Sequence, residues 1–187
     1  ADPTDVYSFL RHVAGNFNSL ALQKQIDIQV AVPNHQLLLT LDRDKLEKIV
    51  LNLLSNAFKF TPKNGWIKVE VHYIDQLQIK VGNSGIPIPE NEQQKIFERF
   101  YQAGDTRHQG DGVGLALVKE LVGLQQGEIG VESEAAKGTW FWVNLPLEGV
   151  SKLLAAEEKK HHTTKHDLSS LEVERKEIVT KRKISSP

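Results

Sequence analysis

Apolar and polar positions in the first third of the chain alternate between helical and strand-like spacing. Residues 6–25 place apolar side chains three and four positions apart, which predicts one amphipathic helix. Residues 26–32 alternate strictly, and this period of two predicts a strand. A second, shorter strand is expected over residues 37–41. The order helix, strand, strand indicates a mixed α/β domain rather than a bundle or an all-β fold.

The next segment predicts a long helix with clear start and stop signals. The stretch Asp42-Arg43-Asp44 precedes a run with helical periodicity and is a plausible N-cap region. The helix is expected to end near Phe60, because Pro62 disfavours helical backbone at the residue before it. Its apolar stripe comprises Leu46, Ile49, Val50, Leu53 and Ala57.

The remaining pattern predicts four strands, two helices and one loop. A turn rich in Asn and Gly separates the long helix from a hairpin, and glycines and prolines mark residues 82–89 as a loop. The expected strands cover residues 66–74, 77–81, 128–133 and 139–145, and the expected helices cover residues 92–100 and 114–124.

Composition narrows the class of protein. The chain has 187 residues, 40% of them apolar, and a net charge of -1, which gives no electrostatic argument for nucleic acid. It has no cysteine, so disulfides and thiolate metal sites are excluded. No apolar run approaches the roughly 20 residues of a membrane span. The chain begins at Ala1 and contains no Met, which suggests an excised piece of a larger protein.

The character of the sequence changes after Glu148. Residues 1–148 hold the periodic segments and are predicted to form one domain, whereas residues 149–187 are rich in Lys, Glu, His and Ser and hold no aromatic residue. Such a segment can bury little apolar surface. We expect residues 149–187 to be a linker or C-terminal tail.

The long helix carries an unusual polar face. Asn52, Asn56 and Lys59 stand four and three residues apart and so share one side of the helix. Amide oxygens are suitable ligands for Mg²⁺, and a lysine supplies a point charge for phosphate. The pattern is equally compatible with amides that satisfy the backbone of a neighbouring loop.

A glycine-rich segment supplies a second candidate for anion binding. Gly110, Gly112 and Gly114 immediately precede an apolar helix, and backbone N–H groups at a helix N-terminus favour negative charge. A glycine-rich hinge explains the same pattern almost as well. Asp111 would repel a phosphate unless its carboxylate faces away or meets a metal.

Four blocks in this order resemble the ATP-binding catalytic domain of bacterial sensor histidine kinases, a branch of the ATPase superfamily that includes gyrase and the heat-shock chaperones. The similarity covers roughly residues 6–147. The blocks are an N box at residues 52–61, an F box at residues 96–101, a glycine box at residues 110–115 and a Gly-Thr turn at residues 138–139.

The resemblance implies an α/β sandwich of the Bergerat type, a mixed sheet packed on one face by three helices, with ATP and Mg²⁺ as cofactors. Asn52 and Asn56 would take the Mg²⁺-binding roles, and Asn56 and Lys59 would be the catalytic pair at the phosphates. Phe97 and Phe100 would anchor the lid against the core. The nucleotide-contacting residues that the resemblance implies are Asn52, Asn56, Lys59, Asn83, Gly85, Phe100, Gly110, Gly112, Val113, Gly114, Leu115 and Thr139.

The first glycine box departs from the family. Asn83 stands where the family has the Asp that accepts a hydrogen bond from the adenine amino group, and Pro87 replaces a glycine. A neutral acceptor in place of a charged one lowers affinity by about tenfold. Pro87 fixes φ and removes an N–H. A second hypothesis is therefore a degenerate, non-catalytic relay that binds ATP weakly or not at all.

The resemblance also implies partners and a location. None of the seven histidines lies in a phospho-acceptor motif, so the recipient would be a histidine on a dimerisation domain outside this sequence. The match looks most like hybrid two-component kinases, in which a receiver domain follows. We expect a monomeric cytoplasmic domain, without membrane or nucleic-acid contact of its own, from a parent protein anchored in the inner membrane.

Overall fold

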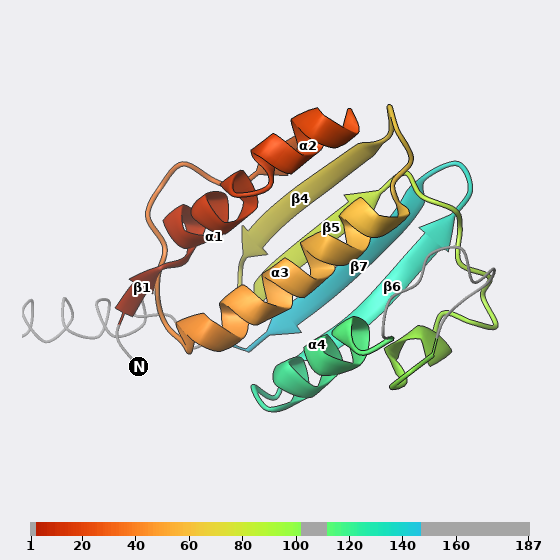
Figure 1. The fold of residues 1–187 in the computed structure, drawn as a ribbon. Coiled ribbons are helices and arrows are strands. Elements are labelled where there is room, and N and C mark those ends of the chain that lie inside the picture. Colours follow the sequence, from red (N-terminus) through yellow and green to blue (C-terminus); the bar gives the residue numbers. More distant parts are fainter. Residues whose placement is uncertain (1–2, 102–111, 147–187) are drawn as a thin grey trace, which may run out of the picture. The chain divides into compact units, whose positions relative to one another are not determined.

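A five-stranded mixed sheet forms the centre of the domain. The computed structural model describes residues 3–101 and 112–146. Within them the strand order is β2-β4-β5-β7-β6, with β2 parallel to β4 and the other pairs antiparallel. Helices lie along one face of this sheet (Figure 1). The strands are β2 (Asp27–Ala31), β4 (Trp66–Tyr73), β5 (Leu77–Asn83), β6 (Glu128–Glu134) and β7 (Gly138–Leu145).

The helices are α1 (Val6–Gly15), α2 (Asn18–Lys24), α3 (Arg43–Phe60) and α4 (Gly114–Gly123), with one 3₁₀ turn, η1 (Lys95–Phe97). A separate two-stranded sheet joins β1 (Pro3–Asp5) to β3 (Leu38–Thr40). The predicted fold class, a mixed sheet covered on one face by helices, is confirmed.

The core lies between α3 and the inner face of the central strands. Alternate side chains of β4, β5 and β7 are buried, as the strand period of two requires. The helical stripe of α3 covers them, and Leu53 and Leu54 are fully buried. This packing fixes α3 along the sheet, so the polar face of the helix is left pointing away from the core.

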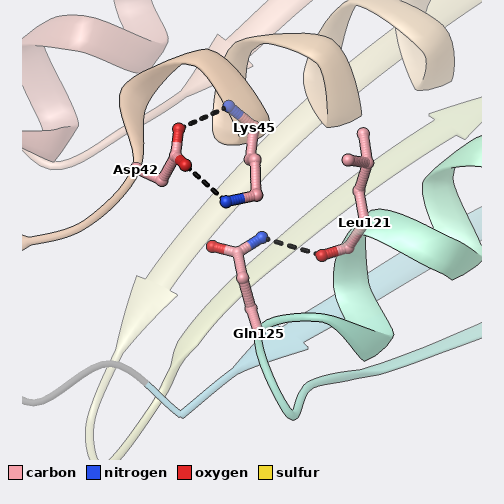
Figure 2. A network of polar contacts seen from close by, with 4 residues as sticks. All are labelled: Asp42, Lys45, Leu121 and Gln125. Atoms are coloured by element: carbon pink, nitrogen blue, oxygen red, sulfur yellow. Dashed lines mark hydrogen bonds and ion pairs between the residues drawn. The ribbon is translucent and has the colours of Figure 1, made fainter.

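Side-chain hydrogen bonds stabilise the N-terminus of α3 and the C-terminus of α4. The Asp42 carboxylate accepts the backbone N–H of Lys45 at 3.0 Å and also bonds the Lys45 ammonium at 2.5 Å (Figure 2). Gln125 Nε2 donates to the Leu121 carbonyl at 3.1 Å, near the C-terminus of α4 (Figure 2). The N-cap region predicted over residues 42–44 is confirmed, with Asp42 as the cap, and so is the predicted end near Phe60.

The single helix predicted for residues 6–25 is wrong, because the chain turns between α1 and α2. The backbone N–H of Phe17 bonds the Ala14 carbonyl at 3.1 Å, and the Phe17 ring stacks on Phe58 of α3 at 5.3 Å between centroids. Burying this aromatic ring against α3 redirects the chain at a Gly-Asn pair, Gly15 and Asn16. Periodicity within 6–25 could not show this contact.

Two other elements differ from their prediction. The helix expected over residues 92–100 is limited to η1, because the hydrogen bonds of this segment close short turns, such as Lys95 N–H to the Glu92 carbonyl. Strand β5 continues through Asn83 instead of ending at Val81. Strand β1, only three residues long, was not predicted.

Candidate functional site

The polar face of α3 meets the N-terminus of α4. Asn52 Nδ2 donates to the Lys48 carbonyl one turn earlier, at 2.7 Å. Asn52 Oδ1 lies so close to α4 that a Cβ on Gly114 would be only 3.1 Å from it. Glycine at this position therefore permits the Asn52 amide to approach the first residue of α4.

Within the part of the chain that the structure describes, the residue at the N-cap position of α4 supplies no side-chain cap. Val113 occupies the cap position with no side-chain hydrogen bond to the helix. The first backbone N–H groups of a helix have no intrahelical acceptor, and the helix dipole favours negative charge beside them. These groups give this end of α4 the chemistry of an anion site, and the Asn52 amide oxygen beside it offers a ligand for a cation that accompanies the anion.

Asn56 and Lys59 lie further along the same helix and are half-buried. The Lys59 ammonium stands over the Phe60 ring, 4.8 Å from its centroid. Asn52 and Lys59 are separated by about 10 Å along the helix axis at 1.5 Å per residue. The three predicted residues thus form an extended polar row.

The residue that lies two positions before α4, Gly112, is hydrogen-bonded to the F box. The Phe100 N–H donates to the Gly112 carbonyl at 3.0 Å. Gly112 has φ +61°, and a Cβ there would lie 2.8 Å from the Phe100 carbonyl carbon, so both conformation and space require glycine. Gly110 and Asp111 lie outside the described residues, as does the remainder of 102–111.

The role predicted for Phe100 as an anchor against the core is wrong. Its backbone adopts φ +65° and its side chain is 76% exposed. Phe97 is the buried aromatic residue of this box and meets Phe141 edge-on at 6.4 Å. The half-buried Tyr101, which sequence reasoning did not single out, packs against the core in its place.

The site has a second end, where β5 finishes beside the start of the antiparallel strand β7. Asn83 and Thr139 are paired in the β5–β7 ladder, and each is only 3% exposed. Asn83 was expected in a loop, but its backbone belongs to the sheet. Gly85 follows so closely that a Cβ would lie 2.5 Å from Asn83 Nδ2 and 2.6 Å from the Phe60 carbonyl oxygen. This end of the site therefore touches the C-terminus of α3.

Ser133, Tyr101 and Glu92 contribute polar contacts that sequence reasoning missed. Ser133 Oγ lies 2.6 Å from Thr139 Oγ1. Burial raises the pKa of the Tyr101 phenol, and the Glu92 carboxylate, which accepts a hydrogen bond from it, raises that pKa further. The Ser133 contact depends on the pairing of β6 with β7, and the Tyr101 contact depends on the path of the chain between the two residues, so local spacing carried no signal for them.

Carboxylate or histidine ligands do not account for a metal at this site. Among residues 3–101 and 112–146, no group of three or more His, Asp or Glu side chains is arranged to hold a metal ion. Within the same ranges, none of the helices combines the length and hydropathy of a membrane span. The oxygen donors at the α3–α4 junction are amides, which suit a hard cation that keeps most of its water or phosphate ligands.

Comparison with known proteins decides the family. Residues 41–149 match the model of the "Histidine kinase-, DNA gyrase B-, and HSP90-like ATPase" family. The chain belongs to this ATPase family. The match includes α3, the β5–β7 strand ends and α4, which are the elements that build the site.

Sequence relatives within the family are sensor kinases. The sensor histidine kinase TmoS of Ectopseudomonas mendocina is 42% identical over 148 residues, which cover 76% of this chain and 15% of TmoS. The sensor histidine kinase RcsC of Escherichia coli (strain K12) is 35% identical over 145 residues, covering 75% of this chain and 15% of RcsC. The chain thus spans only about a seventh of these relatives.

Solved histidine kinases share the fold. The catalytic domain of histidine kinase ThkA matches with a TM-score of 0.69 and 29% identity, over 77% of this chain and 93% of that domain. Full-length ShkA, solved in complex with AMPPNP, matches with a TM-score of 0.68 and 31% identity, over 79% of this chain and 31% of ShkA. The ATPase domain described here is of the sensor histidine kinase type.

Proposed function

We propose that this domain binds Mg²⁺-ATP between α3 and α4 and supplies the γ-phosphoryl group to a histidine on a dimerisation domain. The observation that carries the proposal is the approach of Asn52 Oδ1 to Gly114 at the start of α4, where Val113 supplies no side-chain cap. An amide oxygen and the first backbone N–H groups of α4 offer partners for a hard cation and for phosphate oxygens.

The phosphate end of the proposed site consists of α3 and the start of α4. Asn52 and Asn56 hold Mg²⁺ through their amide oxygens, and Lys59 attracts the phosphates. Mg²⁺, when bound, neutralises charge on the phosphate chain. Backbone groups from the second glycine box face the phosphates, namely those of Gly112, Val113, Gly114 and Leu115.

The base end consists of the β5 and β7 termini. The buried Asn83 presents an amide to the nucleotide base, and Gly85 lets the following loop pass close to α3. Thr139 lies beside Asn83 in the sheet. The exposed ring of Phe100, whose backbone is bonded to Gly112, is available to the nucleotide.

Isothermal titration of the whole chain with AMPPNP tests the binding proposal. We expect saturable heat in the presence of Mg²⁺ and its loss in excess EDTA. Asn52→Ala should weaken binding about tenfold, because it removes one metal-directed oxygen. Asn18→Ala in α2, an exposed position away from α4, is the matched control. Absence of heat at millimolar AMPPNP and Mg²⁺ would contradict the proposal.

A second candidate function is a signalling relay that retains the fold but binds ATP weakly. Asn83 and Pro87 favour it, because they replace the charged acceptor and the glycine of the first box. The relay hypothesis expects no binding by the native chain and binding after Asn83→Asp with Pro87→Gly. Micromolar affinity of the native chain would remove the reason for it.

The partners follow from the same proposal. The phosphoryl acceptor is a histidine on a dimerisation domain outside this sequence. A receiver domain then accepts the phosphoryl group from that histidine. Similarity to sensor histidine kinases supports the histidine acceptor. The receiver domain and a cytoplasmic location in a membrane-anchored parent protein are part of the proposal. Mixing the chain with a separately expressed dimerisation domain and labelled ATP would show transfer to histidine directly.

A further inference from the structure

We infer that Ser133 is a positioning residue of the nucleotide site, an inference that rests on the proposed function. Its side chain lies at the end of β6, outside every block that resembles the family motifs. The Ile88 N–H donates to Ser133 Oγ at 2.8 Å. The same oxygen lies 2.6 Å from Thr139 Oγ1. One hydroxyl therefore connects the loop after β5 to the buried end of β7.

The two prolines that flank Ile88 limit the backbone hydrogen bonds that this part of the loop can make. Ile88 stands between Pro87 and Pro89, neither of which has a backbone N–H. Ile88 is consequently the only residue of the three that can donate a backbone hydrogen bond, and that donor goes to Ser133. The Ile88 carbonyl accepts Gln93 Nε2 at 3.1 Å, so this residue is held on both sides.

The other half of the contact reaches the base end of the site. Thr139 is buried and paired with Asn83 across the β5–β7 ladder. The loop leaves the sheet at Asn83, passes the end of α3 at Gly85 and returns to Ser133 through Ile88. One end of this short loop thus continues from β5 and the other is bonded to β6, and β7 pairs with both of these strands.

The hydrogen-bond inventory of a serine accounts for both contacts. Ser133 Oγ accepts from the Ile88 N–H and still has a proton and a second lone pair, so the bond with Thr139 Oγ1 is possible with either oxygen as donor. Ser133→Ala removes the hydroxyl group, so both hydrogen bonds are lost at once and the Ile88 N–H is left without its acceptor. Ser133→Thr keeps the hydroxyl, and the half-exposed position gives its methyl group room.

The test combines amide hydrogen exchange with titration of Mg²⁺-AMPPNP on the whole chain. In Ser133→Ala we expect at least tenfold faster exchange at the Ile88 amide, unchanged exchange at core amides such as Val69, and about tenfold weaker nucleotide binding. Ser133→Thr should restore both values. Ser19→Ala, an exposed serine of α2, is the matched control and should change neither.

The outcomes separate the inference from the function on which it rests. If the native chain binds and Ser133→Ala leaves either Ile88 exchange or affinity unchanged, the positioning role is wrong and the proposed function stands. Equal weakening by Ser133→Ala and Ser133→Thr would also overturn the role of the hydroxyl. If the native chain does not bind the nucleotide, the proposed function fails and the inference fails with it.

Discussion

At the scale of single residues, the site depends on side chains that are absent as much as on those present. Gly85 and Gly114 lie where a Cβ would meet the Phe60 carbonyl in one case and the Asn52 amide in the other. Neither has the positive φ that would by itself require glycine. Their role is to let two segments approach, a requirement set by their neighbours.

Gly85→Ala should therefore damage the base end of the site. The new methyl group would stand 2.6 Å from a backbone oxygen that cannot move without shifting α3. We expect a loss of about 1–3 kcal/mol in the free energy of unfolding, and weaker nucleotide binding. Urea denaturation and titration measure the two effects.

Gly15→Ala supplies the control for that change. Nothing lies within 4 Å of the position where its Cβ would be, at the end of α1. The substitution should stabilise the protein by about 0.5 kcal/mol through helix propensity, with unchanged nucleotide affinity. Similar losses in both variants would show that the close approach at Gly85 is unimportant.

The side chain of Asn83 is neutral, and replacing it with a charged one should change nucleotide affinity. Asn83→Asp restores an ionised acceptor next to Thr139, and a charge-assisted hydrogen bond is about 1 kcal/mol stronger than a neutral one. We expect AMPPNP affinity to rise by nearly tenfold. An unchanged or lower affinity would mean that the buried amide is already suited to its ligand.

At the scale of elements, α3 is the main support of the phosphate end. Its apolar stripe is buried against the sheet, its N-terminus is capped by Asp42 and its C-terminus stops before Pro62. The direction in which Asn52 and Asn56 project is set by this packing. Changes that loosen α3 should consequently lower both stability and ligand affinity.

The cap of α3 should give a measurable pH dependence. The hydrogen bond from the Lys45 side chain lowers the pKa of Asp42 below its ordinary value. A carboxyl group whose pKa is lower in the folded state stabilises the fold above the unfolded-state pKa, about 3.9, and loses this contribution as the pH falls through the folded value. Asp42→Asn should thus be less stable than the native chain at pH 7, and the difference should shrink below about pH 4.

Urea denaturation at a series of pH values between 3 and 7 measures this difference. The effect should be small and should decrease with salt, because both side chains of the pair are partly exposed to solvent. Lys45→Gln removes the main cause of the lowered pKa and should flatten the pH dependence. If the difference in the free energy of unfolding between the native chain and Asp42→Asn does not vary with pH, the ion pair is not its source.

At the scale of the whole molecule, strand pairing builds one end of the site and helix packing builds the other. Pairing β5 with β7 places Asn83 beside Thr139, and packing α3 against α4 places Asn52 beside Gly114. These contacts join segments far apart in the chain. A ligand that spans both ends would bind only the folded state.

Ligand binding should accordingly stabilise the entire domain. With Mg²⁺-AMPPNP at about 100 times its Kd, the linkage relation gives about 2.7 kcal/mol, or a rise in Tm of roughly 5–10 °C for a domain of this size. Differential scanning calorimetry measures the shift, and EDTA should abolish it. Asn52→Ala should show a smaller shift at the same ligand concentration, and an equal shift would place the ligand elsewhere.

The sequence by itself determined the elements whose signals are local. The N-cap at Asp42, the end of α3 before Pro62 and the start of α4 at Gly114 follow from residue chemistry within a few positions. The order of the motif blocks also pointed to the ATPase family, which the comparisons confirmed. Local propensity and hydrophobic period operate within one element, so they can be recognised without the rest of the chain.

Only the tertiary structure decided what each motif contacts. It turned Phe100 outward, placed Asn83 in a strand, broke the first helix at Phe17 and joined Ser133 to Ile88. Each of these depends on a partner distant in sequence, through strand register or aromatic packing. Contacts of this kind are selected by the free energy of the whole fold, which no short stretch of sequence contains.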